Sequence, residues 1–186
     1  MMSTKRTTKF ITDIVILANS RIWEPQFFAG YDMPIYTASI LIPKKQVKTI
    51  TAMDHARNSA LMDGQLVNSK GFLKKAKTNM PIHDGDGPGM DDHFRGCWVV
   101  NASSLSTPMI WDYRITPISD PKLVQSGCKV RVSLTFFPFA DNKRNIAGIG
   151  CLLGNIQKAC LRDDYDILPD INYEDFEDEF TRIFLK

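Results

Sequence analysis

The sequence predicts a mainly β protein built as a small five-stranded Greek-key barrel, with one inserted helix and an acidic C-terminal tail. Three observations support this fold class. Several short segments alternate between apolar and polar side chains, which is the period of a β-strand. Clusters of Gly, Pro, Asn and Asp separate these segments, as the turns of an antiparallel sheet require. Only one stretch repeats its apolar residues at the spacing of an amphipathic helix.

The first half of the chain supplies two strands and the helix. Ile11–Leu17 is the first predicted strand, and a loop rich in aromatic residues follows it over residues 23–34. Ile35–Ile42 is the second strand, and Lys44–Met62 is the helix, which Asp63-Gly64 closes. The two faces of the second strand are Tyr36, Ala38, Ile40 and Ile42 against Ile35, Thr37, Ser39 and Leu41.

An irregular loop over residues 80–92 precedes the third predicted strand, Phe94–Ser103. Clustered carboxylates and His can hold a divalent ion, so this loop is the one place where a metal-dependent enzyme site could be built. Its spacing does not match an EF-hand, and its Gly and Pro content favours a flexible loop. The candidate ligands are His83, Asp84, Asp86, Asp91, Asp92 and His93.

The last two strands, Cys128–Phe139 and Ile146–Ile156, form a hairpin through the turn at residues 140–145. One face of Cys128–Phe139 is apolar and is expected in the core. The other face is basic, then hydroxylic, then aromatic. Cations attract phosphates and phenyl rings stack on unpaired bases, so this face suits a single-stranded nucleic acid. The alternative is a solvated face whose phenylalanines pack under a loop. The outer set is Lys129, Arg131, Ser133, Thr135, Phe137 and Phe139.

Three glycines, Gly148, Gly150 and Gly154, share one face of the returning strand. Glycine inside a strand marks a bulge, a sharp bend or the close approach of another backbone. A strongly coiled barrel and a ligand lying on the sheet would each require them, and the sequence does not separate these causes. Five strands with a helix between the second and third suit the oligonucleotide-binding (OB) barrel, whose hairpin loops hold nucleic acid.

Charge is distributed unevenly along the chain, although the net charge is only +2. Residues 163–186 contain nine acids and two bases, which gives −7, whereas residues 1–162 carry +9. A basic body attracts polyanions, and an acidic tail can compete for the same groove or recruit proteins. We therefore expect a flexible basic arm over residues 1–9, an OB-fold domain over residues 10–162 and an acidic tail over residues 163–186.

The composition also argues against several classes of protein. No apolar run approaches the length of a membrane span, and residues 1–18 do not match a signal peptide, so a cytosolic protein is expected. The four cysteines have no zinc-site spacing and are expected to be buried free thiols. No metal and no cofactor is expected.

The recognisable runs of the chain are WEPQFF, YTASILIPK, NASS, ITPISDPKLVQSGCKVRVSLTFFPF and GIGCLLGNIQKACLRD. These runs resemble a family of bacteriophage single-stranded-DNA-binding proteins first described as a domain of unknown function, DUF2815. The resemblance implies an OB fold, sequence-independent binding of single-stranded DNA in phage replication or recombination, and an acidic C-terminus. The likeness covers roughly residues 10–164 and departs at the end, where TRIFLK adds two cations after the acids.

The predicted contacts combine this resemblance with residue chemistry. Lys129 and Arg131 are the first choices for phosphates, and Phe137 and Phe139 for bases. The two tryptophans of the set have a strong alternative as core residues, because a large ring in a small barrel is more often buried. The remaining candidates are Lys143, Arg144, Tyr36, Trp98, Trp111 and Arg95.

Three hypotheses follow. The first is a non-enzymatic single-stranded-DNA-binding protein in the cytoplasm of an infected bacterial host, whose acidic tail contacts replication or recombination proteins. A barrel edge or the tail could each mediate a homodimer. The second is a metal-dependent nucleic-acid enzyme that uses the loop at residues 84–92. The third is a protein-interaction adaptor that acts through the tail alone.

Overall fold

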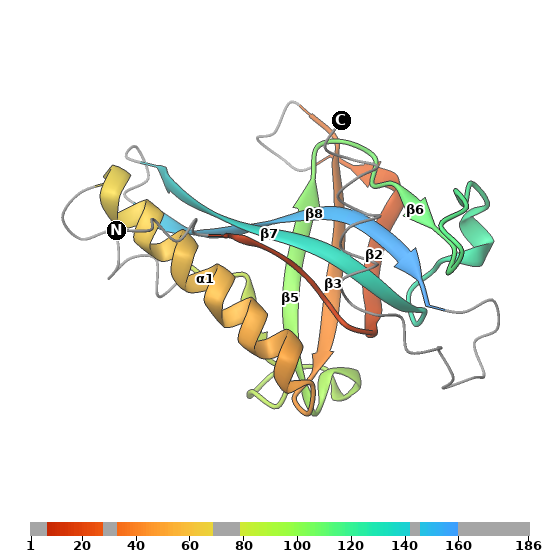
Figure 1. Cartoon of the computed structure of the whole chain (residues 1–186), viewed down its shortest axis with the longest axis horizontal. Coiled ribbons are helices and arrows are strands. Elements are labelled where there is room, and N and C mark those ends of the chain that lie inside the picture. The colour runs from red at the N-terminus through yellow and green to blue at the C-terminus, as the bar shows by residue number, and fades with distance from the viewer. Residues whose placement is uncertain (1–6, 28–32, 69–78, 142–145, 160–186) are drawn as a thin grey trace.

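The computed structural model describes residues 7–27, 33–68, 79–141 and 146–159 (Figure 1). Side chains are described up to residue 64 of the helix. The α-helix and strands, in chain order, are β1 (Lys9–Ile11), β2 (Val15–Gln26), β3 (Ile35–Pro43), α1 (Val47–Asn68), β4 (Ile82–Asp84), β5 (Cys97–Ser104), β6 (Ile110–Trp111), β7 (Lys129–Asp141) and β8 (Ile146–Lys158).

Five strands close into a barrel. Strand β2 pairs with β3, β3 with β5, β5 with β8, β8 with β7, and β7 with β2 again, which completes the ring. All these pairs are antiparallel except β5 with β8, which meet in parallel at Ser103 and Leu152. In Figure 1, β7 and β8 run across β2, β3 and β5. This closed five-stranded arrangement confirms the predicted OB-type fold class.

Alternation places the core as the sequence predicts. On β7, the side chains of Val130, Val132, Leu134 and Phe136 are at most 1% exposed. On β3, Ala38, Ile40 and Ile42 are buried in the same core. Each strand thus contributes every second residue to the barrel interior, because successive strand side chains point to opposite faces.

The helix α1 closes one side of this core. Its buried residues Met53, Ala56 and Ala60 belong to the same cluster as Phe10 and Phe136, whose rings lie 5.4 Å apart. The helix begins three residues later than predicted, because Pro43 and Gln46 form a turn through a 2.9 Å backbone hydrogen bond. It also ends later than predicted, since Asp63 and Gly64 lie inside it. The insertion of one helix between the second and third barrel strands is confirmed.

The first strand differs from its predicted extent. Instead of a single strand at residues 11–17, β1 and β2 are separated at Thr12, whose hydroxyl accepts a 3.0 Å hydrogen bond from the Val132 backbone N–H. Strand β2 then continues to Gln26, into the segment predicted as a loop. Trp23 thereby lies in a strand, and its indole N–H donates to the Val124 carbonyl over 2.8 Å.

The third strand begins at Cys97 instead of Phe94, because residues 92–94 form a 3-10 turn. Cys97 and Cys151 are buried and Cys128 is half-buried; all three are free thiols. Within the described residues, no helix has the length and apolarity that a membrane crossing requires. Of the arm predicted over residues 1–9, residues 1–6 lie outside the described residues, whereas Lys9 begins β1 and pairs with β7. The tail at residues 163–186 also lies outside the described residues.

Candidate nucleic-acid interface

The outward face of β3 and β5 has two different ends. At the end near Pro43, Leu41, Cys97 and Val99 form a second apolar cluster against Met90 and Phe94. At the other end, the side chains become hydroxyl and amide groups. Both ends belong to the same two strands. They differ because the chain around residues 90–94 covers the end near Pro43.

A groove of about 430 Å³ lies at the uncovered end. Strands β3 and β5 form its floor, and the β7–β8 hairpin contributes Phe137, Gly150 and Cys151. Its lining residues are Asn19, Thr37, Ala38, Ser39, Pro81, Asn101, Ala102, Ser103, Phe137, Gly150 and Cys151. In OB folds, the corresponding strand face and the adjoining hairpin loops hold oligonucleotides. This groove is therefore the candidate interface.

The floor of the groove contains a fixed pair of polar side chains. Ser39 and Asn101 are directly opposed in the β3–β5 pairing, and the Ser39 hydroxyl donates to Asn101 Oδ1 over 2.8 Å. Ser39 is buried, whereas Asn101 is exposed. The pair thus holds the Asn101 amide at the solvent side of the sheet.

Phe137 stands at the wall of the groove, opposite Gly150 in the β7–β8 pairing. Its side chain is 36% exposed. A Cβ placed on Gly150 would lie 2.3 Å from the Phe137 ring, so the ring occupies the space that the missing side chain leaves. Phe139 lies over Gly148 in the same way, at 2.6 Å. These two glycines accommodate the aromatic rings of the neighbouring strand, which resolves the question that the sequence left open.

Gly154 follows the same rule with a smaller partner, because its Cβ would lie 2.1 Å from the Ser133 hydroxyl oxygen. The three glycines of β8 thus leave room for side chains of β7 that lean across the strand. Phe137 and Phe139 share the outward face of β7, as the alternation predicts. Of the two, Phe137 borders the groove.

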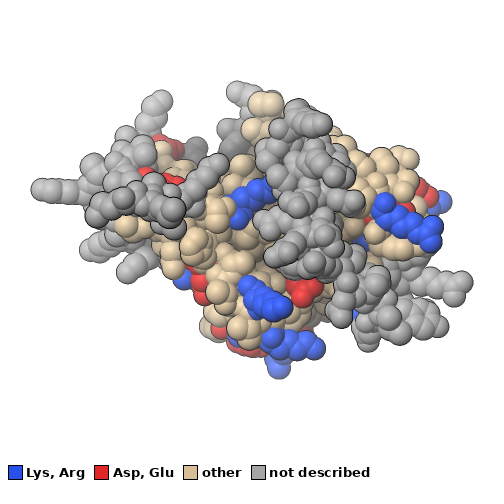
Figure 2. Space-filling model, viewed as in Figure 1, with Lys and Arg blue, Asp and Glu red and all other residues tan. Residues whose placement is uncertain are grey.

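Arg21 is an exposed cation beside the groove. It pairs directly with Thr37, so its side chain starts on the same face of the sheet as the groove floor. A bulge precedes it, where Asn19 adopts a φ of 44°. On the face drawn in Figure 2, Lys and Arg of the described residues lie at separate places instead of one continuous patch. On this face, the charges of the described residues therefore do not by themselves mark an interface.

The predicted phosphate contacts are only partly described. Lys129 is half-buried. Arg131 is 8% exposed, and its Nη2 lies 3.9 Å from Asp13 Oδ1, so contact with a phosphate requires the side chain to become uncovered. Its role stays a prediction. Lys143 and Arg144 lie outside the described residues.

The remaining candidates do not gather at the groove. Tyr36 is half-buried, and its hydroxyl accepts a 2.8 Å hydrogen bond from Thr107 Oγ1. Trp111 is 8% exposed, which agrees with the alternative that its ring is a core residue. Trp98 is half-buried against the main core at the opposite end of β5, and Arg95 pairs with Asp92 over 2.8 Å. A role for any of these in binding stays a prediction.

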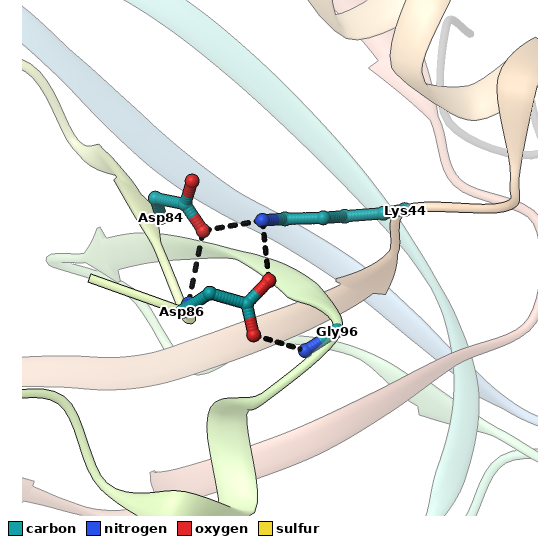
Figure 3. A network of polar contacts seen from close by, with 4 residues as sticks. All are labelled: Lys44, Asp84, Asp86 and Gly96. Carbon is teal, nitrogen blue, oxygen red and sulfur yellow. Dashed lines mark hydrogen bonds and ion pairs between the residues drawn. The ribbon is translucent and has the colours of Figure 1, made fainter.

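The acidic loop is held by a lysine. Lys44 Nζ lies 2.5 Å from Asp84 Oδ1 and 2.6 Å from Asp86 Oδ2 (Figure 3). It also lies 5.1 Å from the centre of the Trp98 ring. Asp86 also accepts a 2.9 Å hydrogen bond from the Gly96 backbone N–H. Hydrogen bonds from Lys44 lower the pKa of both carboxyl groups, and the two aspartates raise the pKa of Lys44.

The other acids of this loop have partners of their own. Asp91 pairs with the His93 ring, which lowers the pKa of Asp91 and raises that of His93, and Asp92 pairs with Arg95. Among the described residues, no three His, Cys, Asp or Glu side chains converge to hold a metal ion. The loop therefore has the geometry of an ionic clamp between the end of β3 and the start of β5.

Sequence reasoning missed most of the groove. Arg21, Ser39 and Asn101 were not among the predicted contacts. Their signal was present, because Thr37 and Ser39 alternate with the core residues of β3, and Asn101 does so on β5. Polar residues on the outward face of a strand are common, however, and only the pairing of β3 with β5 brings these together.

Comparison with known proteins agrees with this geometry. The family model described as "Enterobacter phage Enc34, ssDNA-binding protein" matches residues 8–179. Among solved structures, the single-stranded DNA-binding protein from bacteriophage Enc34 in complex with ssDNA has a TM-score of 0.70 at 17% identity, and the likeness covers 86% of this chain and 88% of that chain.

A second structural neighbour is more distant. The single-stranded DNA-binding protein gp2.5 encoded by bacteriophage T7 has a TM-score of 0.56 at 14% identity, over 88% of this chain and 98% of that chain. At these identities the structural likeness shows the fold. No curated protein sequence matches the chain.

Proposed function

The chain belongs to the family of the ssDNA-binding protein of Enterobacter phage Enc34, and from that premise we propose that it binds single-stranded DNA without sequence preference. The observation that carries the proposal is the open groove on β3 and β5, with its polar floor, the Phe137 ring at its wall and Arg21 beside it. A ring offers a stacking surface to any base, and an exposed cation attracts the backbone phosphate.

We propose that this binding protects single strands during bacteriophage DNA replication or recombination, in the cytoplasm of the infected bacterial host. In this role the protein is not an enzyme and requires no cofactor. The ionic clamp supports a non-catalytic role, because Asp84 and Asp86 are already engaged by Lys44. A nuclease assay with labelled single-stranded DNA and Mg²⁺ or Mn²⁺ tests this point. Cleavage above a buffer control would contradict it.

The acidic tail, residues 163–186, is proposed to contact replication or recombination proteins and to compete with DNA for the basic body. Deleting residues 163–186 separates a DNA-binding protein from an adaptor. A DNA-binding protein should bind an oligonucleotide at least as well without its tail, since a local polyanion has been removed. Loss of binding on deletion would contradict the proposed competition.

The direct test of the proposed function is a fluorescence-anisotropy titration of labelled oligo-dT at several salt concentrations. We expect tight binding that weakens steeply with salt, because phosphate contacts release counterions. An unlabelled duplex should not displace the oligonucleotide, whereas unlabelled oligo-dC should. Absence of binding at low salt would remove the proposal.

A further inference from the structure

We propose that the groove between β3, β5 and Phe137 takes one unstacked nucleobase, whose edge accepts a hydrogen bond from the Asn101 amide. This inference rests on the proposed function, and it names which part of the DNA occupies the groove and which side chain contacts the base edge. It makes Asn101 a base-contacting residue and Ser39 its positioning residue.

The lining of the groove selects a neutral ligand. The described residues that line it carry hydroxyl, amide, apolar and aromatic groups, and none of them is charged. Cations supply most of the attraction for a phosphate, whereas the edge of a base presents neutral donors and acceptors, so an uncharged lining favours the base. The volume of about 430 Å³ lies at the small end of the range for ligand pockets, roughly 300–1,000 Å³. One flat heterocycle fits this chemistry, with the sugar-phosphate backbone outside near Arg21.

The Asn101 amide has a fixed orientation. An Asn side chain has one acceptor oxygen and one NH₂ donor, and here the oxygen accepts the Ser39 hydroxyl over 2.8 Å. The NH₂ group is therefore turned away from Ser39. Because Asn101 is exposed and lines the groove, this group offers its hydrogens to a ligand there. Ser39 is buried, so its hydroxyl holds the amide without itself facing solvent.

The Phe137 ring supplies the second half of the site. It lies over Gly150, a residue that also lines the groove, so the ring rests against the sheet instead of standing free of it. A base that stacks on the exposed face of this ring lies along the sheet surface. Its edge then faces the side chains that rise from the floor, among which Asn101 carries the amide.

A single donor suits a protein without sequence preference. On the edge that faces the minor groove in a duplex, thymine presents O2 and adenine N3, and both are acceptors. Cytosine O2 and guanine N3 are acceptors in equivalent positions. One amide donor can therefore contact whichever base enters the groove, and we expect the same contribution for dT and dC.

The experiment compares oligo-dT with an abasic oligonucleotide of equal length, which keeps the phosphates and lacks the bases. The ratio of the two affinities reports the contribution of the bases. Asn101→Ala should lower binding to oligo-dT roughly tenfold, as expected for the loss of one hydrogen bond in a partly buried site, and leave abasic binding unchanged. Ser39→Ala should lower the same ratio by a smaller factor, and Ser39→Thr, which keeps the hydroxyl, should restore it.

Asn58→Ala is the matched control, because Asn58 is exposed on α1, outside the groove lining. If Asn101→Ala fails to fold, Asn101→Ser tests the same amide. Equal losses for oligo-dT and abasic DNA, or no loss at all, would overturn the inference, and so would a loss confined to one base. Equal wild-type binding to oligo-dT and abasic DNA would overturn the inference and leave the proposed function standing. Only failure of the wild-type protein to bind any single strand removes the proposed function.

Discussion

The two halves of the outward face of β3 and β5 differ in how the rest of the chain covers them. Near Pro43 it is covered, with Leu41 and Val99 buried and with Lys44 clamped to Asp84 and Asp86. Near Ser104 it is open, with Asn101 exposed in an uncharged groove. The covered half holds the charges of the clamp, whereas none of the described residues that line the groove is charged.

This difference shows which polar groups are available to a ligand. The carboxylates and the ammonium of the clamp satisfy one another, so an incoming ligand would have to break existing ion pairs. In the groove, the Ser39–Asn101 hydrogen bond uses the acceptor oxygen of the amide and leaves its NH₂ donor for a ligand. A ligand therefore gains more binding free energy in the weakly polar half than in the strongly charged half.

The largest expected effect comes from Gly85 in the covered half. A Cβ there would lie 2.0 Å from the Phe94 carbonyl oxygen and 2.7 Å from that of Cys97, so backbone must move. We expect Gly85→Ala to lower the free energy of unfolding by about 3 kcal/mol, measured by urea denaturation. Gly87→Ala, whose nearest backbone atom is 3.0 Å away, should cost much less. Equal losses for the two variants would contradict this assignment.

The next effect comes from Phe137 in the open half. Phe137→Ala should weaken oligo-dT binding by about 1–3 kcal/mol, the contribution of one base–aromatic stack, with an unchanged salt slope. Gly150→Ala should displace the ring and weaken binding less, because the flexible ring can move. Leu152→Ala is the control, since Leu152 is exposed on the same face without a ring. If Leu152→Ala weakened binding as much as Phe137→Ala, stacking would not be the cause.

A smaller effect is expected at Arg21. Arg21→Ala should lower the slope of log K against log salt by about 1, because one phosphate contact is lost. Lys45→Ala, an exposed cation beyond the other end of β3, should leave the slope unchanged. Arg131→Ala sharpens the comparison. Because Arg131 is buried, its removal should flatten the salt slope only if the side chain becomes uncovered on DNA binding. Salt-dependent anisotropy titrations of the three variants measure these slopes.

The smallest effect is expected at Lys44, because the clamp is solvent-exposed. The lowered pKa values of Asp84 and Asp86 mean that their contribution to stability is present above about pH 4 and is lost as the pH falls through their folded values. The raised pKa of Lys44 means that its contribution is present below about pH 10.4 and is lost as the pH rises through its folded value.

Lys44→Met should therefore lower the Tm at neutral pH and reduce the fall of Tm on acidification, without changing oligo-dT affinity. Thermal melts between about pH 3 and pH 7 measure this. Arg95→Met is the control, because its ion pair with Asp92 is far more exposed and is expected to add little. A lower DNA affinity of Lys44→Met would show that the DNA interface includes the covered half.

The strands and the core were predictable because alternation is a local property of the sequence. For this reason Val130 to Phe136 were assigned to the correct faces, and Ala38, Ile40 and Ile42, which are buried, were sorted onto one shared face. The interruption at Thr12 was not predictable, since its hydroxyl bonds to Val132, 120 residues later. The role of Gly150 was equally hidden, because it depends on the register that places Phe137 opposite.

The sequence predicted the chemistry of the candidate site, but it did not predict where on the sheet the site lies. Phe137 was identified from its strand face, and it borders the groove. Ser39 and Asn101 belong to segments about sixty residues apart, and only strand pairing makes them neighbours. Trp98 and Arg95 carry suitable chemistry and lie at the other end of β5, because chemistry alone does not say where along a strand the sheet is covered.

The parallel seam between β5 and β8 has a consequence for biosynthesis. The chain is made from its N-terminus, and the ring of strands closes only when β7 pairs with β2, which was made more than a hundred residues earlier, and β8 pairs with β5. Such long-range closure is slow compared with local helix formation. During translation β2, β3 and α1 therefore leave the ribosome before the groove has its Phe137 wall. The groove is complete only once β7 and β8 have left the ribosome, so we expect a nascent chain that lacks them to remain inert toward single strands.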